Sequence, residues 1–188
     1  MKNIKPKKKW GQNFLVDQNT CKKIVRAINT NNTNQILEIG SGTGAITSLL
    51  AEKIKKITAI EIDSNLCKIL NDKKIANLEI INQDILKTKL DNFNHKIVVG
   101  NLPYYITTPI IFKLFNSKMP WEEMYFLMQK EVADRIVAKP GTKIYGRLTI
   151  MTQIFSEVKQ LFNISSKVFR PMPGVESTLV KFTRKKII

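Results

Sequence analysis

The stretch "VVGNLPYYITTP" at residues 98–109 ends an apolar run with four groups of different chemistry. The Asn101 side-chain oxygen and the Leu102 carbonyl can each accept a hydrogen bond, so together they can hold the two N–H groups of an exocyclic amine. Pro103 fixes the local backbone angle and removes a competing donor, and Tyr104 offers a ring on which a base can stack. This order predicts a site that holds the amino group of a flipped-out base. Such a site would catalyse a reaction by positioning the amine, without a covalent enzyme intermediate. The plainer alternatives are a turn residue for Asn101 and a core aromatic for Tyr104.

A second group of residues has the spacing of a nucleotide site. Gly40, Gly42 and Ala45 follow an apolar run and fit the pattern G-x-G-x-x-G/A. Glycines at such a turn let a ligand approach the backbone closely. Glu61 lies 21 positions after Gly40, where a carboxylate can accept two hydrogen bonds from a ribose diol. These residues do not separate a nicotinamide dinucleotide from S-adenosylmethionine, because both contain an adenosine ribose.

Two further features favour S-adenosylmethionine. Glu38 stands two positions before the first glycine and the glycines continue to Gly44, which gives E-x-G-x-G-x-G, a form typical of S-adenosylmethionine sites. Asp84 ends the run "NQD", where its carboxylate could accept a hydrogen bond from the adenine amino group. The plainer alternatives are an ordinary strand-to-helix turn for the glycines, a solvated strand end for Glu61 and a helix N-cap for Asp84.

These residues need a fold that brings them together. Apolar runs and helical patterns alternate over the first 138 residues, which predicts an α/β fold with a mostly parallel, doubly wound sheet and helices on both faces. The last two of its seven strands arrive without a helix between them, so we expect an antiparallel end. Ligands of such sheets bind at the carboxyl ends of the strands, where "EIG", "EID", "NQD" and "GNLPY" would all lie. The expected strands are 35–40, 56–63, 77–84, 95–101, 123–129, 158–165 and 177–183, and the expected helices are 18–28, 46–54, 65–74, 108–115, 130–138 and 147–155.

The composition indicates a polyanionic partner. Lys and Arg number 31 against 15 Asp and Glu, a formal net charge of +16, which favours nucleic acid over membrane and over a lysine-rich composition alone.

The 188 residues, 43% of them hydrophobic, suit one domain at 11–188 behind a basic arm at 1–10. No apolar run approaches the roughly 20 residues that span a bilayer. Cys21 and Cys67 lie far apart and His95 has no Cys or His neighbour, so we expect reduced thiols in a cytoplasmic protein without a metal site.

The motifs together resemble those of one enzyme family. "NLPY" at 101–104 resembles the [N/D]-[P/I/L]-P-[Y/F] signature of amino-group methyltransferases. With "GQNFL" at 11–15, "EIGSGTGAIT" at 38–47 and "FRPMPGVEST" at 169–178, it occurs in the order typical of the small-subunit ribosomal RNA adenine dimethyltransferases, the KsgA group. The resemblance covers about residues 7–183. It implies a Rossmann-like methyltransferase fold, S-adenosylmethionine as methyl donor, and dimethylation of N6 on two adjacent adenosines of small-subunit ribosomal RNA during ribosome biogenesis.

The resemblance also implies roles for individual residues. Phe169 would stack on the far face of the target base, with a hydrophobic plug as the alternative, whereas Tyr105 is expected only to pack. Lys7, Lys8 and Lys9 would lie along the RNA backbone. The partner would be ribosomal RNA or the immature small subunit, and the protein is expected to act as a monomer. The remaining implied cofactor-binding residues are Gln12, Asn13 and Leu15 at the methionine and ribose end, Ile62 and Ile85 beside the adenine ring, and Asn101 next to both cofactor and base.

The sequence departs from the group's usual pattern at three points. Ser41 stands where proline is usual, and "VEST" at 175–178 stands where "VDSA" is common. The group generally continues into a small helical C-terminal domain, whereas this sequence stops at "KFTRKKII". The first two differences leave the predicted methyl-transfer site unchanged, and the third bears on recognition of the ribosomal particle.

Three other functions remain open on the sequence alone. The related large-subunit, macrolide-resistance methyltransferases more often have isoleucine before the proline, where this chain has Leu102. A non-catalytic relative that binds RNA or DNA would keep the fold without turnover, although the presence of Gly40, Glu61, Asp84 and Asn101 argues against lost catalysis. A nicotinamide oxidoreductase would leave "NLPY" and the positive charge unexplained.

Overall fold

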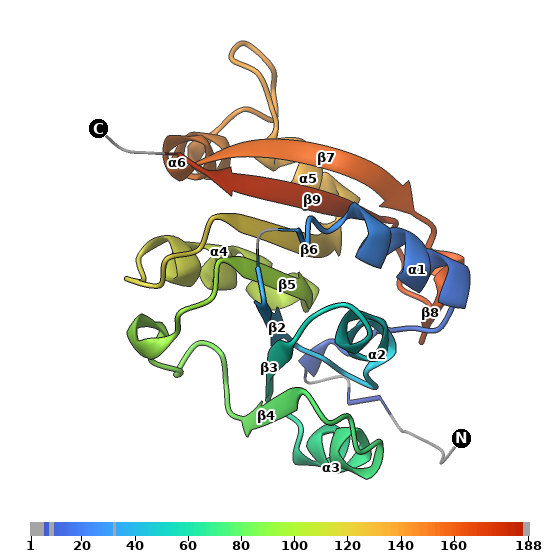
Figure 1. The fold of residues 1–188 in the computed structure, drawn as a ribbon. Coiled ribbons are helices and arrows are strands. Elements are labelled where there is room, and N and C mark those ends of the chain that lie inside the picture. Colours follow the sequence, from blue (N-terminus) through green and yellow to red (C-terminus); the bar gives the residue numbers. More distant parts are fainter. Residues whose placement is uncertain (1–5, 8–9, 32, 186–188) are drawn as a thin grey trace.

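A seven-stranded sheet forms the centre of the molecule (Figure 1). The structure is a computed structural model that describes residues 6–7, 10–31 and 33–185. Five neighbouring strands of the sheet are parallel, and two further strands at one edge run antiparallel to their neighbours. The predicted α/β fold with an antiparallel end is therefore confirmed. In sheet order the strands are β4 (Leu78–Asn82), β3 (Lys56–Glu61), β2 (Gln35–Ile39), β5 (Ile97–Asn101), β6 (Glu123–Gln129), β9 (Ser177–Arg184) and β7 (Ser156–Ile164).

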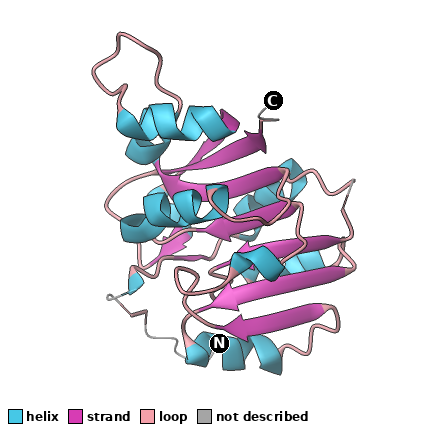
Figure 2. Cartoon of the chain, turned by 90° about the vertical axis from the view of Figure 1, so that its left-hand side faces the viewer, coloured by secondary structure: helices cyan, strands magenta, loops and turns pink. Residues whose placement is uncertain are grey.

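Helices cover both faces of this sheet, as Figure 2 shows. Two separate apolar cores result, one on each face. Helices α1 (Gln18–Ala27) and α2 (Ala45–Ala51) contribute to one core. The other core contains side chains of α4 (Thr107–Phe115), α5 (Lys130–Ile136) and α6 (Arg147–Phe155), and α3 (Ser64–Asp72) packs beside β3 and β4.

Strand β6 shows why the sequence folds this way. Its run of apolar residues is buried on both faces, as expected of an inner strand of a sheet that helices cover on both sides. Met124 and Phe126 point into the core shared with α4, whereas Tyr125 and Leu127 point into the core shared with α1. The alternation follows from the two-residue period of a strand.

Two helices begin at the aspartates that the sequence indicates. The Asp17 carboxylate accepts a hydrogen bond from the Thr20 N–H (2.7 Å), and the Asp63 carboxylate accepts one from the Asn65 N–H (3.0 Å). Each carboxylate satisfies a backbone donor that the helix itself leaves without an acceptor. Asp63 therefore belongs to the start of α3, and β3 ends at Glu61 rather than at residue 63 as predicted.

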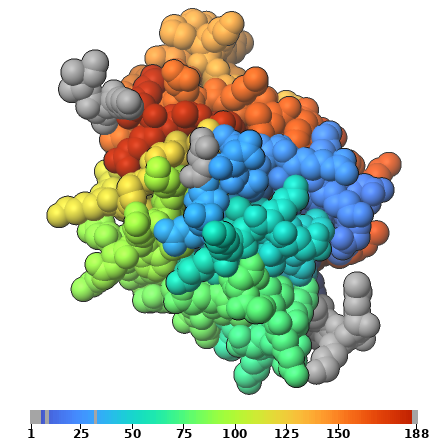
Figure 3. Space-filling view, viewed as in Figure 1, coloured from blue at the N-terminus to red at the C-terminus, as the bar shows by residue number. Residues whose placement is uncertain are grey.

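A second, two-stranded sheet was not predicted. In it, β1 (Phe14–Leu15) pairs antiparallel with β8 (Phe169–Arg170), so that Leu15 lies opposite Phe169. Strands of two residues carry no periodic pattern that sequence analysis can detect. The space-filling view shows the blue segment around α1 against the orange-red C-terminal strands (Figure 3). The "GQNFL" and "FRPMP" motifs are therefore neighbours in space.

No helix in the described ranges combines the length and apolar character needed to cross a bilayer.

Candidate functional site

A cavity of about 230 Å³ lies at the carboxyl ends of β2, β3, β4 and β5. It is lined by residues from the N-terminal segment, from the glycine-rich turn after β2 and from the loop after β5. The structure brings every predicted site residue except Phe169 to this one cavity. These residues are Gln12, Asn13, Leu15, Gly40, Gly42, Glu61, Ile62, Asp84, Ile85, Asn101, Leu102, Pro103 and Tyr104.

The glycine-rich turn is tied to the end of β3. Gly40 and Gly42 have φ angles of +71° and +57°, values that side chains other than glycine rarely adopt. The Gly42 N–H donates to Glu61 Oε2 (2.9 Å), and the Asp63 N–H donates to Glu61 Oε1 (2.9 Å). Burial nevertheless raises the pKa of Glu61 above its ordinary value. The turn therefore presents a buried carboxylate, fixed in orientation, at the cavity wall.

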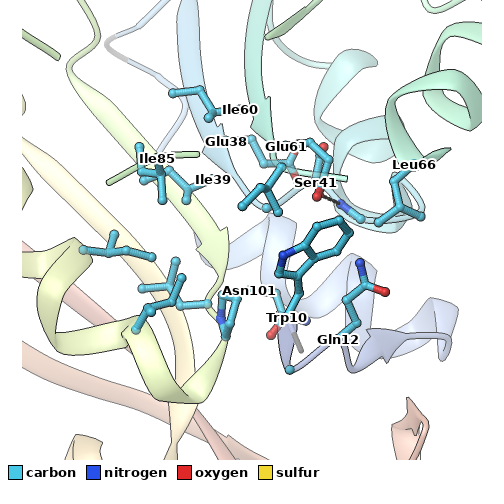
Figure 4. A pocket seen from close by; sticks show the side chains of 18 of the residues that line it. Trp10, Gln12, Glu38, Ile39, Ser41, Ile60, Glu61, Leu66, Ile85 and Asn101 are labelled. Carbon is cyan, nitrogen blue, oxygen red and sulfur yellow. Dashed lines mark hydrogen bonds between the residues drawn. The ribbon is translucent and has the colours of Figure 1, made fainter. Parts of the chain in front are cut away.

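Two further polar side chains in the cavity wall have an atom without a partner. Glu38 Oε2 and Ser41 Oγ are buried and make no hydrogen bond to any described residue. Burial, with a smaller contribution from the Glu61 carboxylate, raises the pKa of Glu38 to about 7. Figure 4 shows both side chains beside the cavity, next to Glu61. Buried polar groups normally have partners, so this part of the wall fits a polar ligand.

The raised pKa of Glu38 predicts a pH-dependent stability of the free protein. Between the ordinary pKa of 4.5 and about pH 7, the folded protein retains a proton that the unfolded chain has lost. The free energy of unfolding should therefore fall as pH rises through this range, in total by up to about 3 kcal/mol. Glu38→Gln should remove much of this fall in thermal unfolding measured from pH 4.5 to 8. The control is Glu157→Gln at an exposed position of β7, and an unchanged pH profile in Glu38→Gln would contradict the prediction.

The amide of Asn101 is oriented by the N-terminal segment. Its Nδ2 donates to the Asn13 carbonyl oxygen (3.0 Å). Since the oxygen and nitrogen of an amide point in different directions, this bond turns Oδ1 away from Asn13. No described donor contacts Oδ1. The arrangement presents an acceptor at the end of β5, as the "NLPY" motif predicts.

The rest of the "NLPY" loop is held by the surrounding structure. The Leu102 N–H donates to the Leu127 carbonyl of β6 (3.1 Å), and the Leu102 side chain is buried in the core. Thr107 Oγ1 donates to the Pro103 carbonyl (3.1 Å). The Tyr104 hydroxyl is hydrogen-bonded to the Ser177 hydroxyl, with 2.9 Å between the oxygens. Each residue of the loop thus has at least one fixed contact to an element behind it.

A segment formed by Lys7 and residues 10–13, here called the strap, borders the cavity on the N-terminal side. Lys7 Nζ forms an ion pair with Asp63 (2.7 Å), and Gln12 Nε2 donates to the same carboxylate (3.1 Å). Burial acts to raise the pKa of Asp63, but these two contacts, together with the Asn65 N–H, outweigh it and lower the pKa. Trp10 and Gln12 reach the cavity from this strap (Figure 4).

The position of Lys7 differs from the prediction. It was expected on an RNA backbone as part of a basic arm at 1–10, but its ammonium group binds Asp63 beside the cavity. The reason is that Asp63 is a buried carboxylate within reach of the strap. Lys8 and Lys9, for which the same RNA contact was predicted, lie outside the described residues.

Tyr105 is also placed differently from the prediction. Its side chain, expected only to pack, is 58% exposed and lines the cavity. A Cβ atom at Gly11 would lie 3.3 Å from the Tyr105 ring, so the ring rests against the strap. Sequence analysis also missed Trp10 as a cavity residue. Both residues are adjacent in sequence to a predicted motif, Trp10 to "GQNFL" and Tyr105 to "NLPY", and this adjacency could have indicated that they line the cavity.

The residues predicted to lie beside the adenine ring both line the cavity. Ile85 is buried, and Ile62 is 40% exposed at the cavity wall. Asp84 Oδ1 accepts a hydrogen bond from the Leu86 N–H (2.8 Å). This turn ends β4 at Asn82 instead of residue 84. The residues that follow Asp84 form a turn and not a helix, so the helix N-cap alternative is wrong. The turn leaves the second carboxylate oxygen of Asp84 for a ligand.

Phe169 does not line the cavity, contrary to the prediction that it stacks on the target base. The side chain is fully buried in the core that also contains Leu15, Leu127 and Leu179. Its backbone pairs with Leu15 through the short sheet of β1 and β8, and this pairing fixes the ring inside the core. The structure thus corresponds to the alternative, a hydrophobic plug under the "RPMP" loop.

Replacements of Phe169 should therefore affect stability more than chemistry. Phe169→Ala is expected to lower the free energy of unfolding by about 3–5 kcal/mol, because it leaves a cavity in a packed core. Phe169→Leu retains most of the volume and should keep methyl transfer within a few-fold of the unaltered chain. Urea unfolding and single-turnover rates measure the two effects. A large loss of rate in Phe169→Leu at nearly unchanged stability would instead support stacking on a base.

No group of three or more His, Cys, Asp or Glu side chains placed to hold a metal ion occurs in the described part of the chain.

The chain is similar to known proteins over nearly its whole length. Residues 3–187 match the family described as ribosomal RNA adenine dimethylase. The chain is 46% identical to ribosomal RNA small subunit methyltransferase A of Geobacillus thermodenitrificans, over 95% of this chain and 64% of the relative. It therefore spans less than two thirds of that relative's length.

Two crystal structures are also similar. A dimethyladenosine transferase from Plasmodium falciparum has a TM-score of 0.83 and 33% identity, over 92% of this chain and 63% of the other. The 23S rRNA methyltransferase ErmE has a TM-score of 0.78 and 30% identity, over 92% and 70% of the two chains. The match over nearly its whole length shows that the chain belongs to the ribosomal RNA adenine dimethylase family.

Proposed function

We propose that this chain transfers methyl groups from S-adenosylmethionine to the N6 amine of adenine in small-subunit ribosomal RNA, and dimethylates two adjacent adenosines during ribosome biogenesis. The observation that carries the proposal is a convergence of two sites. The Glu61 carboxylate and the Asn101–Tyr104 loop, from different strands, line the same cavity. The group that would bind the ribose and the groups that would hold the amine are therefore within one small volume.

The cavity residues fit S-adenosylmethionine. The unpartnered Glu38 Oε2 and Ser41 Oγ could receive the polar methionine end. Glu61 would accept hydrogen bonds from the ribose hydroxyls, while Ile62, Asp84 and Ile85 would hold the adenine ring. Gln12, Asn13 and Leu15 would line the methionine and ribose end. When bound, this cofactor supplies an electrophilic methyl group on a sulfonium centre.

The "NLPY" loop would hold and aim the attacking amine. An adenine N6 amine is a poor nucleophile, because its lone pair is delocalised into the ring. Asn101 Oδ1 would accept one N–H and the Leu102 carbonyl the other, which turns the lone pair toward the cavity. Tyr104 would support the base by stacking. This is catalysis by position and electrostatics, and it needs no strong base among the lining residues.

The charge of the chain supports a ribosomal RNA partner. A formal net charge of +16 gives a favourable long-range interaction with a polyanion. Such a substrate would place the reaction in the cytoplasm. We propose that the chain acts as a monomer, since one chain supplies every group named here.

The large-subunit alternative has one observation in its favour, which is the similarity to the 23S rRNA methyltransferase ErmE. Leu102 before the proline, the "FRPMPGVEST" motif and the higher identity to small-subunit relatives favour the small-subunit reaction.

Transfer of labelled methyl groups tests the proposal. The 188-residue chain is incubated with labelled S-adenosylmethionine and with either immature small subunits or large-subunit RNA, and the product nucleosides are identified. N6,N6-dimethyladenosine in the small-subunit RNA is the expected result. Label only in the large-subunit RNA would favour the alternative. Cofactor binding without label in either RNA would contradict turnover by this chain and favour a binding role.

A further inference from the structure

The hydrogen bond between Tyr104 and Ser177 joins two motifs that are 73 positions apart in the sequence. Tyr104 lines the cavity and is only partly buried, whereas Ser177 is fully buried at the start of β9. Ser177 belongs to the "VEST" segment at 175–178. The proposed reaction assigns no role to this segment. Its hydroxyl reaches the far end of the ring that the proposed function uses as a stacking surface.

Ser177 is a rigid anchor for this contact. It lies between two strands, opposite Gln129 of β6 and Ile164 of β7. The neighbouring Glu176 carbonyl accepts a hydrogen bond from the Lys130 N–H (3.0 Å). The Ser177 Oγ position is therefore set by the sheet and not by the loop that carries Tyr104.

The bond restricts one of the two side-chain angles of Tyr104 on which stacking depends. The hydroxyl oxygen lies on the long axis of the ring, so a bond to it fixes the direction of that axis. This direction is set by χ1, the rotation that moves a whole ring toward or away from a neighbouring cavity. At the opposite end, the Pro103 carbonyl is held by Thr107 Oγ1. The backbone that carries the ring and the hydroxyl at its far end are thus both held before a base arrives.

We propose that Ser177 is a positioning residue that holds the Tyr104 ring, through the hydroxyl–hydroxyl bond, in the orientation required to stack on the target base. The inference rests on the proposed function, because it concerns the same site. A direct chemical role for the phenol does not explain the contact. Burial raises the pKa of Tyr104, so its hydroxyl stays protonated near neutral pH and cannot serve as a base.

The test removes the bond from either end. Tyr104→Phe keeps the ring and Ser177→Ala keeps the strand, and each should lower the single-turnover methyl-transfer rate by about ten-fold, the effect expected of one hydrogen bond. The double variant should be no slower than either single variant, because both changes remove the same contact. Affinity for S-adenosylhomocysteine should remain unchanged in all three.

A second readout does not depend on activity. Three-bond couplings of labelled tyrosine in the RNA-free protein report χ1 of Tyr104, and we expect one rotamer in the unaltered chain and averaged rotamers in Ser177→Ala. The matched control is Ser156→Ala. Ser156 is also a fully buried first residue of a strand, and its Oγ donates to the Thr152 carbonyl (2.9 Å) away from the cavity. It should lose similar stability and keep both the rate and the rotamer.

The outcomes separate this inference from the proposed function. A full rate and a single Tyr104 rotamer in Ser177→Ala would overturn the positioning role. So would rate losses of Tyr104→Phe and Ser177→Ala that multiply in the double variant. If Ser177→Ala fails to fold, the rate of Tyr104→Phe decides, since this change lies at the partly exposed end of the bond. If the unaltered chain methylates no RNA, the proposed function fails, and the χ1 measurement still shows whether Ser177 holds the ring.

Discussion

Asn101→Ala is expected to slow methyl transfer by about 100- to 1000-fold, while the affinity for the cofactor changes by only a few-fold. The magnitude is that of losing one preorganised polar group at a reacting centre. Asn101 Oδ1 has no donor among the described residues, and its orientation is set by the Asn13 carbonyl. Alanine removes both the acceptor and the contact that orients it. The carboxylate of Glu61 and the glycine-rich turn remain, so cofactor binding should be largely retained.

Single-turnover rates with saturating RNA, together with calorimetric titration of S-adenosylhomocysteine, separate the two effects. The matched control is Asn77→Ala. Asn77 Nδ2 also donates to a backbone carbonyl, that of Ala51 (2.9 Å), but it lies outside the residues that line the cavity. The Asn77→Ala variant should be less stable than the unaltered chain but should keep its single-turnover rate of methyl transfer. An Asn101→Ala chain as active as the unaltered chain would refute the role proposed for this amide.

Glu61→Gln is expected to weaken cofactor binding by about 100-fold. In the free protein the carboxylate accepts the N–H groups of Gly42 and Asp63, one on each oxygen. Glutamine keeps one oxygen and directs an NH₂ group at the other donor, so a backbone N–H loses its acceptor and the turn is displaced. The ribose would also lose a charged acceptor. The lost backbone contact and the weakened ribose contact are each worth about 1.5 kcal/mol. Together they correspond to a rise of about 100-fold in the dissociation constant.

The measurement is calorimetric titration with S-adenosylhomocysteine, accompanied by thermal unfolding to verify that the variant is folded. Glu79→Gln is the control, because Glu79 is an exposed carboxylate on β4 that pairs with Lys56 (2.8 Å), away from the cavity. Its dissociation constant should equal that of the unaltered chain. Equal affinities of the Glu61→Gln and unaltered chains would show that this carboxylate does not hold the ribose.

The position of the strand-end residues in the cavity could be predicted from the sequence, because it depends on two features that the sequence shows locally. These strands are segments of at least five residues that are rich in apolar side chains, and parallel strands in such a fold bring their carboxyl ends to one edge. Gly40, Glu61, Asp84 and Asn101 each follow such a run, and all four line the cavity. Asp17 and Asp63 were identifiable as caps for a similar reason, since capping depends on residues within a few positions.

The remaining features depend on contacts that no local pattern encodes. The ion pair between Lys7 and Asp63 joins residues 56 positions apart. A lysine run without structural context indicates a basic arm for RNA and not a carboxylate partner in the same chain. Phe169 is buried because two-residue strands pair, and such strands have no period. Tyr105 is exposed because the short helix that begins at Tyr104 points one tyrosine to Ser177 and the next toward Gly11. These placements depend on tertiary geometry.

The hydrogen bond from Asn101 to the Asn13 carbonyl has a consequence for the order and strength of ligand binding. Asn13 lies in the strap, and Asn101 belongs to the loop proposed to hold the base; both residues line the cavity. A ligand that contacts the strap at Asn13 would therefore also act on the orientation of the Asn101 amide. By thermodynamic linkage, the factor by which bound cofactor tightens RNA binding must equal the factor by which bound RNA tightens cofactor binding. Donor and acceptor substrates would then be coupled allosterically through a single backbone carbonyl.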